Sequence, residues 1–331
     1  MSSLERILPF LSSIRDLLVD PDITEVMVNG GGRAVFVERA GVLEQLPART
    51  VEEKHLAVAI KNIARTCGDE ISEEQPILDA RLEDGSRVAA MFRPCSVTGP
   101  ALTIRRFTRR YSLDDLIAIG SVPARGAALL RDAVVERQNI LISGGTGTGK
   151  TTLLNALAAI ISDADRLVLI EETSEIQLQK PNYLRFEARR ALPRFGDSAG
   201  VSAVTIADLL RATLRHRPDR IIVGEVRGAE AFDLLQALNT GHVGSMTTIH
   251  ANSAEQALVR LAHCVLSGNA GLPHAAIREA IALAIHMIVH ISRNGAQREI
   301  TEVVRVRGYE PELDRFVVEH LYTRGNGTTG P

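Results

Sequence analysis

The sequence predicts an α/β protein in which a smaller α+β domain precedes a larger domain built on a mostly parallel sheet. From Asn139 onward, short apolar runs alternate with helical patterns, which is typical of a parallel sheet covered on both faces. Before that point, β-rich runs flank glycine-containing turns such as residues 29–32, and this pattern indicates hairpins of an antiparallel sheet. With 331 residues, 45% of them hydrophobic, the chain is long enough for both domains.

The smaller domain is expected to span residues 1–110. Apolar side chains recur every three or four positions over residues 4–19, which predicts an amphipathic helix that ends before Pro21. Residues 51–67 predict a second helix. Strands are expected at residues 23–28, 34–38, 80–82, 87–92 and 101–107.

Helical patterns at residues 113–119 and 124–136 are expected to form linker helices within residues 111–137. The larger domain then spans residues 138–322, and the Gly- and Thr-rich residues 323–331 are expected to form a flexible tail. Its strands are expected at 140–143, 167–170, 221–223 and 245–249, followed by short strands up to about residue 321. Its helices are expected at 150–161, 205–215, 229–239, 254–266 and 273–284.

Charge and hydropathy argue against two other classes of protein. The formal net charge is −2, whereas a chain that holds nucleic acid along its length usually has a basic excess. No direct nucleic-acid binding is therefore expected, although Arg105, Arg106, Arg109 and Arg110 form a local basic patch. The most apolar stretch, residues 280–291, is shorter than the roughly 20 residues that cross a bilayer, and the first residues lack a signal-peptide pattern. A cytoplasmic protein with no transmembrane segment is expected.

A glycine-rich loop between an apolar strand and a helix carries the strongest chemical signal. It consists of Gly144, Gly145, Thr146, Gly147, Thr148, Gly149, Lys150 and Thr151, with Thr152 next in the helix. The glycines let successive backbone N–H groups point at a phosphate, and the helix N-terminus adds its positive end. Lys150 is expected to reach the β- and γ-phosphates and Thr151 to ligate Mg²⁺. The alternative, a glycine-rich turn without function, does not account for the strand and helix on either side.

Carboxylates follow two further strands. Glu171 and Glu172 end the strand at 167–170, and either one is a candidate to orient the water that attacks a γ-phosphate. The alternative for this pair is a solvated acidic loop. Glu225 follows the strand at 221–223, as the acid on the Mg²⁺ side does in nucleotide-binding sheets. Arg227 is expected to pair with Glu225 or to approach phosphate.

Histidine and arginine side chains complete the candidate set. His250 ends the strand at 245–249, where it is expected to sense phosphate or to position a carboxylate. The alternative is a hydrogen-bonded histidine of the core. Arg211 and Arg215 are four residues apart on one helix face, and a solvated face explains them equally well.

Taken together, the motifs go beyond a generic phosphate loop. They are residues 142–155, the acidic box 170–176, residues 217–227, residues 240–252 and, in the first domain, residues 84–87 and 102–107. In this order and spacing they resemble the secretion ATPase superfamily of type II and type IV secretion, conjugation and tight-adherence pilus assembly. The likeness is greatest to its TrbB-like or CpaF-like branch. The absence of paired CxxC motifs departs from the type II branch, in which a four-cysteine zinc module is usual.

The resemblance implies a RecA-like P-loop domain, a homohexamer, and ATP with Mg²⁺ bound between the two domains. It implies that Lys150 and Thr151 hold phosphate and Mg²⁺, and that Glu225 is the acid on the Mg²⁺ side. Glu171 becomes the favoured catalytic carboxylate, with Glu172 its neighbour and His250 the histidine of the fourth motif. Arg87 and Arg105 match positions from which the first domain reaches nucleotide, a task that suits the guanidinium fork.

The function that the resemblance implies is an ATP-hydrolysing motor at the cytoplasmic face of a bacterial inner membrane. It would power protein or pilin secretion, pilus assembly or conjugative transfer, with membrane platform proteins as partners. The alternative is a RecA-type nucleic-acid translocase or helicase, which the net charge and the aromatic content of 4% disfavour. A nucleotide-dependent regulator that hardly hydrolyses ATP is disfavoured by the acids Glu171 and Glu225.

Overall fold

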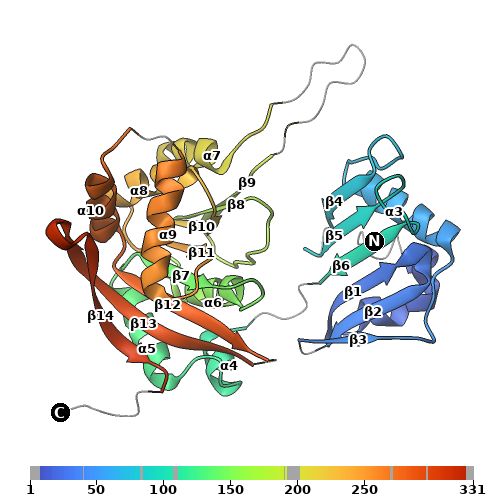
Figure 1. Ribbon diagram of the computed structural model, residues 1–331, viewed down its shortest axis with the longest axis horizontal. Helices are drawn as coiled ribbons and strands as arrows, with labels where there is room; N and C mark the ends of the chain where they lie inside the picture. The colour runs from blue at the N-terminus through green and yellow to red at the C-terminus, as the bar shows by residue number, and fades with distance from the viewer. Residues whose placement is uncertain are drawn as a thin grey trace. The chain divides into compact units, whose positions relative to one another are not determined.

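The computed structural model describes residues 8–39, 41–82, 85–106, 111–189, 191, 202–268, 271–295 and 297–325. The chain divides into two compact units, Met1–Arg109 and Arg110–Pro331, which Figure 1 labels by their elements. Each unit has a sheet and a core of its own, and each is described by itself.

An antiparallel sheet forms the frame of the first unit. Its strands are β1 (Ile23–Asn29), β2 (Ala34–Arg39), β3 (Val42–Gln45), β4 (Ile77–Arg81), β5 (Arg87–Met91) and β6 (Ala101–Arg105). They lie in the order β3-β2-β1-β6-β5-β4, and every neighbouring pair is antiparallel. The predicted antiparallel sheet is confirmed. Strand β3 was not expected, because all four of its residues are exposed and show no alternation.

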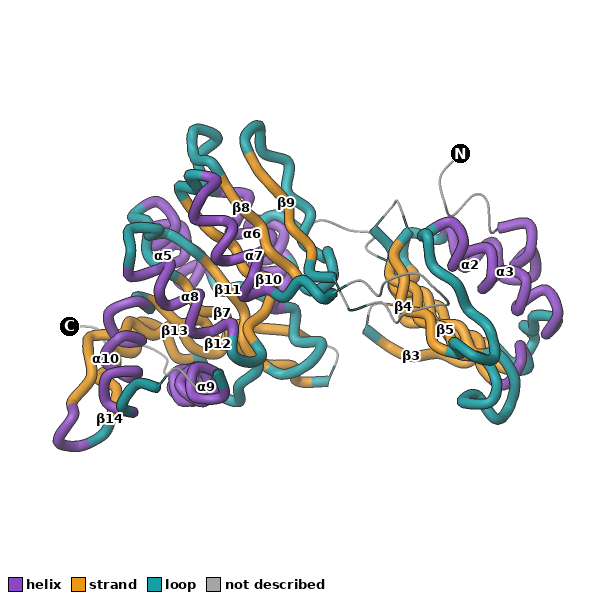
Figure 2. Tube along the Cα trace, turned by 90° about the horizontal axis from the view of Figure 1, so that it is seen from above, coloured by secondary structure: helices purple, strands orange, loops and turns teal. Residues whose placement is uncertain are grey.

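Helices cover one face of this sheet, as the tube in Figure 2 shows for α2 (Arg15–Val19) and α3 (Glu53–Thr66). Alternate strand residues such as Val26 and Val28 pack against Ile60 and Ile63 of α3, which follow helical spacing. The helix predicted at residues 4–19 is not continuous. Its described part begins with a 3₁₀ helix, η1 (Leu8–Ile14), that has non-helical dihedral angles at Leu11.

The turn between β1 and β2 depends on glycine. It is η2 (Gly30–Gly32), in which Gly31 has a φ of +69° and Gly32 a φ of +97°. A Cβ on Gly32 would collide with the carbonyl of Val51, so this turn and the chain before α3 pack together only with glycine here.

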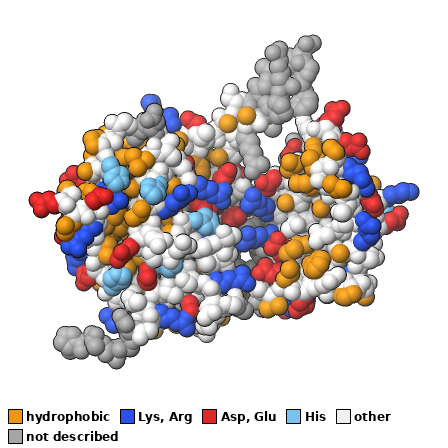
Figure 3. All heavy atoms as spheres, in the orientation of Figure 1, with side chains coloured by type: hydrophobic (Ala, Val, Ile, Leu, Met, Phe, Trp, Pro, Cys, Tyr) orange, Lys and Arg blue, Asp and Glu red, His pale blue; other side chains and the backbone are white. Residues whose placement is uncertain are grey.

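Figure 3 shows hydrophobic side chains gathered on the visible face of this unit. The exposed large apolar residues of the unit include Val42, Leu43, Ile77 and Val97.

A mostly parallel sheet forms the frame of the second unit, as predicted. Its strands are β7 (Ile140–Gly144), β8 (Leu167–Glu171), β9 (Tyr183–Glu187), β10 (Arg220–Val226), β11 (Met246–Ile249), β12 (Met287–Asn294), β13 (Gln297–Glu310) and β14 (Arg315–Thr323). The order is β14-β13-β12-β7-β11-β10-β8-β9. The strands from β12 to β9 are parallel, and β13 and β14 add an antiparallel edge.

Helices pack on both faces of this sheet. On one face lie α4 (Leu113–Ala118), α5 (Ala124–Val135) and α6 (Lys150–Ile160). On the other lie α7 (Ile206–Thr213), α8 (Glu230–Asn239), α9 (Ala254–Ser267) and α10 (His274–Ala284). Two 3₁₀ turns, η3 (Leu214–His216) and η4 (Pro311–Leu313), complete the described elements. The helices expected as linkers, α4 and α5, contribute Leu116 and Leu130 to the core of this unit.

Two differences from the predicted elements concern strands. The strands after α10 are not short, since β13 alone has 14 residues. Strand β9 was not predicted, because it lies at the sheet edge and none of its five residues is fully buried. Within the part of the chain that is described, no helix combines the length and the hydropathy needed to cross a membrane.

Candidate functional site

The glycine-rich loop joins β7 to α6 at the carboxyl edge of the parallel sheet. Its strand is buried at all five residues, and its helix begins at Lys150. Gly147 and Gly149 have φ values of +69° and +96°, which other residues rarely adopt. The backbone from Gly145 to Gly147 is exposed. The loop therefore presents accessible N–H groups at a helix N-terminus, the arrangement that binds phosphate.

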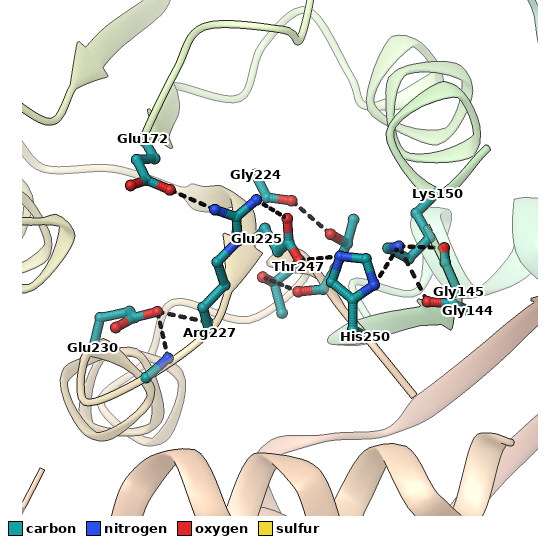
Figure 4. A network of polar contacts seen from close by, with 12 residues as sticks. Gly144, Gly145, Lys150, Glu172, Gly224, Glu225, Arg227, Glu230, Thr247 and His250 are labelled. Atoms are coloured by element: carbon teal, nitrogen blue, oxygen red, sulfur yellow. Dashed lines mark hydrogen bonds and ion pairs between the residues drawn. The ribbon is translucent and has the colours of Figure 1, made fainter. Parts of the chain in front are cut away.

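Lys150 lies folded over this loop. Its Nζ donates hydrogen bonds to the carbonyls of Gly144, at 3.1 Å, and Gly145, at 2.8 Å, and lies 3.4 Å from Nδ1 of His250 (Figure 4). Burial lowers the pKa of Lys150, while the carboxylate of Glu225 acts in the opposite direction. A buried ammonium group with neutral carbonyl partners is ready to gain an anionic partner such as phosphate.

His250 connects Lys150 to Glu225. Its Nε2 lies 2.7 Å from Oε1 of Glu225, and its Nδ1 faces the lysine. Burial first, and then the charge of Lys150, lower the pKa of His250. These partners fit a neutral imidazole that carries its proton on Nε2, donates to the carboxylate and accepts from the ammonium.

Arg227 extends the same set of contacts to the acidic box. Its two terminal nitrogens lie 2.8 Å from Oε2 of Glu225 and 2.7 Å from Oε2 of Glu172. Figure 4 shows these side chains pointing toward one another from the ends of β10 and β8. Together they form one polar network, which runs from Lys150 through His250, Glu225 and Arg227 to Glu172. Sequence reasoning expected the Arg227–Glu225 pair and not its continuation to Glu172.

Glu171 lies apart from this network. Its side chain is buried, and Oε1 accepts hydrogen bonds from the backbone N–H groups of Glu175, at 2.7 Å, and Ile176, at 2.8 Å. Oε2 lies 3.2 Å from a guanidinium nitrogen of Arg185. Burial raises the pKa of Glu171, and these three donors oppose the rise. In this arrangement Glu171 holds the turn of residues 172–176, the acidic turn.

Glu175 is the carboxylate that sequence reasoning did not select. Its negative charge is among the influences that raise the pKa of Lys150, and it acts on Arg227 in the same way. The signal was present in the sequence, because Glu175 is the last acid of the box at residues 170–176. It was passed over because a strand that ends at Glu171 makes the first two acids the nearest candidates.

A pocket opens beside the phosphate loop. Its mouth is open to solvent, and its walls come from the loop, α6, the chain around α4 and two strands. Thr148, Gly149 and Thr152 form the side toward the loop. Apolar side chains form most of the rest, from the chain around α4 and from β12 and β13, among them Tyr111, Val122, Ile291 and Ile300.

The two arginines expected to reach nucleotide lie in the first unit. Arg87 of β5 and Arg105 of β6 are direct partners in the antiparallel register, on the sheet face opposite the helices. Both Nε and a terminal nitrogen of Arg87 bond to Asp79, each at 3.2 Å. Of the rest of the basic patch, Arg109 and Arg110 lie outside the described residues.

Oxygen donors suitable for Mg²⁺ are present at the loop. Thr151 is half-buried in the first turn of α6, and the carboxylate of Glu225 belongs to the polar network that includes Lys150. Among the described residues, no group of three or more His, Cys, Asp and Glu side chains forms a protein-only metal site. One hydroxyl and one carboxylate, together with phosphate oxygens, are the kind of ligands that Mg²⁺ usually has.

Most of the chain is similar to known proteins of one family. The family model described as type II/IV secretion system protein matches residues 11–312. The chain is 39% identical over 307 residues to the conjugal transfer protein TrbB of Rhizobium radiobacter, covering 92% of this chain and 89% of that protein. It is 34% identical over 336 residues to the type IV secretion system protein VirB11 of Brucella suis, covering 92% and 90%.

A solved structure supports the fold. The X-ray structure of the Legionella pneumophila ATPase DotB matches with a TM-score of 0.58 and 21% identity, and covers 94% of this chain and 82% of that one. At this identity the likeness concerns the fold alone. It agrees with the observed sequence of a small antiparallel unit followed by a mostly parallel sheet.

Proposed function

Since the chain belongs to the family of type II/IV secretion system proteins, we propose that it is an ATP-hydrolysing motor for secretion, pilus assembly or conjugative transfer. The observation that carries the proposal is the polar network at the carboxyl edge of the parallel sheet. It connects the lysine of a phosphate loop, through His250, to the acids of two neighbouring strands. Phosphoryl transfer needs this kind of positioned charge rather than covalent chemistry.

Nucleotide binding would begin at the loop. The N–H groups from Gly145 to Gly149 would surround the β-phosphate, and Lys150 would exchange its carbonyl partners for phosphate oxygens. Thr151 and Glu225 would hold Mg²⁺, which neutralises charge on the β- and γ-phosphates when it is bound. His250 would keep the Glu225 carboxylate oriented by donating its Nε2 proton.

The acidic turn would supply the carboxylate that orients the attacking water. Glu171 is the residue that the motif resemblance favours, but both of its oxygens already accept hydrogen bonds from backbone amides and Arg185. Glu172 reaches the network through Arg227, and the charge of Glu175 acts on Lys150. We therefore assign water orientation to Glu172 or Glu175, and the shaping of the turn to Glu171.

The pocket beside the loop would take the nucleoside. Thr152 follows the two residues that hold phosphate and Mg²⁺, so a nucleotide on the loop directs its α-phosphate and sugar toward this side of α6. The apolar lining, with the Tyr111 ring and the Ile300 side chain, suits the flat face of a base.

Assembly and location are parts of the same proposal. A homohexamer, peripheral at the cytoplasmic face of the inner membrane and bound to platform proteins of a secretion system, would use closure of one domain on the other for work. Arg87 and Arg105 would then contact nucleotide from the first unit. The relatives are named for conjugal transfer and type IV secretion, which favours export over the alternative of a nucleic-acid translocase.

The test is phosphate release from ATP by the purified chain, with and without Mg²⁺. We expect Mg²⁺-dependent turnover in the wild type and none in Lys150→Ala, with both proteins equally folded by circular dichroism. Equal turnover in the wild type and in Lys150→Ala would show that the phosphate loop has no role in the hydrolysis of ATP. Light scattering with ATP tests the hexamer, and added DNA tests the alternative, which predicts stimulation of turnover.

A further inference from the structure

A residue outside every motif contacts the acidic box. Arg185 lies on the edge strand β9, whose register places it beside Leu169 of β8. One of its terminal nitrogens lies 3.2 Å from Oε2 of Glu171 and donates to the carbonyl of Ile176 at 2.9 Å. The same guanidinium nitrogen thus meets both ends of the acidic turn, the carboxylate before it and the carbonyl that closes it.

Both oxygens of the Glu171 carboxylate have hydrogen-bond partners in the turn or on Arg185. The N–H groups of Glu175 and Ile176 bind Oε1, and Arg185 binds Oε2, while the side chain is 3% exposed. On the other side lies Gly224 of β10, where a Cβ would stand 3.0 Å from the Glu171 side chain. Glycine therefore leaves the space that the Glu171 side chain occupies, and Arg185 approaches from the opposite strand.

The shape of the turn determines where its other acids lie. Because Oε1 of Glu171 fixes the backbone at residue 175, the Glu175 side chain leaves the turn from a defined point. Glu172, next to Glu171, is half-exposed and meets Arg227 of the polar network. Any change in the Glu171 carboxylate would thus move Glu172, which pairs with Arg227, and Glu175, whose charge acts on Lys150.

We infer that Arg185 is a positioning residue of the ATPase site: it fixes Glu171 beneath the acidic turn and thereby sets where Glu172 and Glu175 stand. This inference rests on the proposed function. The hydrogen bonds of Arg185 go to Glu171 and to the carbonyl of Ile176, so it acts on the site through Glu171. An arginine suits the task because it stays charged at every working pH and its planar group can serve a carboxylate and a carbonyl together.

Charge makes the role measurable. Arg185 is the cation that lowers the pKa of Glu171 against the effect of burial. The other charged groups on the packed strands are Glu187, the exposed register partner of Glu171 on β9, and Glu225 and Arg220 on β10. Arg220 lies at the opposite end of its strand, beside Leu167, where it pairs with Asp165. Without Arg185, the Glu171 carboxyl would gain its proton at higher pH, and the backbone amides would lose a charged acceptor.

The experiment compares steady-state ATP turnover of the wild type, Arg185→Gln and Arg185→Lys across pH. For Arg185→Gln we expect kcat lower by on the order of ten- to a hundred-fold with KM for ATP within about two-fold, since a displaced group costs rate more than ground-state binding. The acidic limb of the kcat profile should move up by about one pH unit or more. Arg185→Lys should restore part of kcat and most of the pH profile, because it retains the charge.

Arg166→Gln is the matched control. Arg166 also ties the β8 side of the sheet to the chain before β9, through Asn182 at 2.6 Å, but it does so at the opposite end of these strands. It should lower the melting temperature without moving the pH profile. If Arg185→Gln only lowers the melting temperature, as this control does, and keeps the wild-type kcat and pH profile, Arg185 serves the fold alone and the inference is overturned.

The positioning role of Arg185 and the proposed ATPase activity can be contradicted independently of each other. Loss of turnover in Lys150→Ala with normal behaviour of Arg185→Gln contradicts the positioning role and leaves the ATPase intact. Absence of turnover in the wild type itself contradicts the ATPase first. Should Arg185→Gln not fold, the kcat of Arg185→Lys decides, because lysine keeps the charge but not the planar guanidinium group. A wild-type kcat in Arg185→Lys also overturns the inference.

Discussion

The carboxylate of Glu225 lies 2.7 Å from Nε2 of His250, and the other ring nitrogen of that histidine lies 3.4 Å from Nζ of Lys150. Three strands of the parallel sheet therefore contribute to one line of contacts, since Lys150 follows β7, His250 follows β11 and Glu225 is in β10. Lys150 and Glu225 are thus connected through this histidine.

His250→Gln tests the central member of the network. Because burial and Lys150 lower the pKa of His250 below its usual value, the unfolded chain binds this proton more readily than the folded chain does. The histidine therefore makes stability increase as pH rises through the window that ends near its unfolded pKa of about 6.5. Free energies of unfolding at about pH 5 and about pH 7.5 should differ less in His250→Gln than in the wild type.

If the free energy of unfolding changes with pH to the same extent in the wild type and in His250→Gln, the pKa of His250 is not lowered in the folded chain. Turnover gives a second reading of the same variant. A glutamine can donate to Glu225 but cannot also accept from Lys150 in the geometry of the ring, so we expect kcat to fall on the order of ten-fold while the protein stays folded.

Three glutamine variants separate the acids of the box. Either Glu172→Gln or Glu175→Gln should bind ATP and lose most of its turnover, and both variants should have melting temperatures near that of the wild type. Glu171→Gln should lose about 1–3 kcal/mol of stability as well, because the amide cannot accept from Arg185 and from two backbone N–H groups together. Binding is measured with a fluorescent ATP analogue and stability by urea denaturation. A Glu171→Gln variant of unchanged stability that has lost turnover would make Glu171 the residue that acts on water.

Gly149→Ala tests the loop conformation. Gly149 has a φ of +96°, so a side chain there should cost about 1–2 kcal/mol of stability and weaken nucleotide binding. Gly308→Ala is the matched control, because its φ is not in the left-handed region and nothing lies within 4 Å of the added Cβ. Equal melting temperatures for the two variants would mean that the loop adopts a conformation open to other residues.

Much of the second unit was predictable because its signals are local. Most predicted parallel strands are runs of apolar residues, as residues 167–170 and 140–142 are, and β7 and β8 are buried along their whole length. The phosphate loop was predictable for the same reason, since its glycines, Lys150 and the flanking strand and helix are consecutive in the chain. The fold class and the family were confirmed on this basis.

The parts that were missed depend on contacts between distant segments. Tyr183–Glu187 has alternating partial exposure that becomes a strand only because β8 is available beside it. Neither the commitment of Glu171 to Arg185 nor the link from Arg227 to Glu172 can be seen from spacing along the chain, because the partners are 14 and 55 residues apart. Glu171 is buried and Glu172 is half-exposed, and this difference arises from the packed sheet rather than from the residue types.

Lys150→Met removes the charged group at the phosphate-loop end of the polar network. It removes a buried charge, whose desolvation opposes folding, and it leaves the carbonyls of Gly144 and Gly145 without this donor. These two effects oppose each other, so the free energy of unfolding should stay within about 1 kcal/mol of the wild type. At ATP about 100-fold above its Kd, the wild type should gain about 2.7 kcal/mol of stability and the variant none.

Single-turnover hydrolysis of labelled ATP with excess protein and Mg²⁺ tests the central claim most directly. The wild type should convert the bound ATP to ADP and phosphate, and Lys150→Met should form no product while it remains as stable as the wild type. Product formation at the same rate in both proteins would contradict a reaction at the phosphate loop and, with it, the role of the network that ends on Lys150.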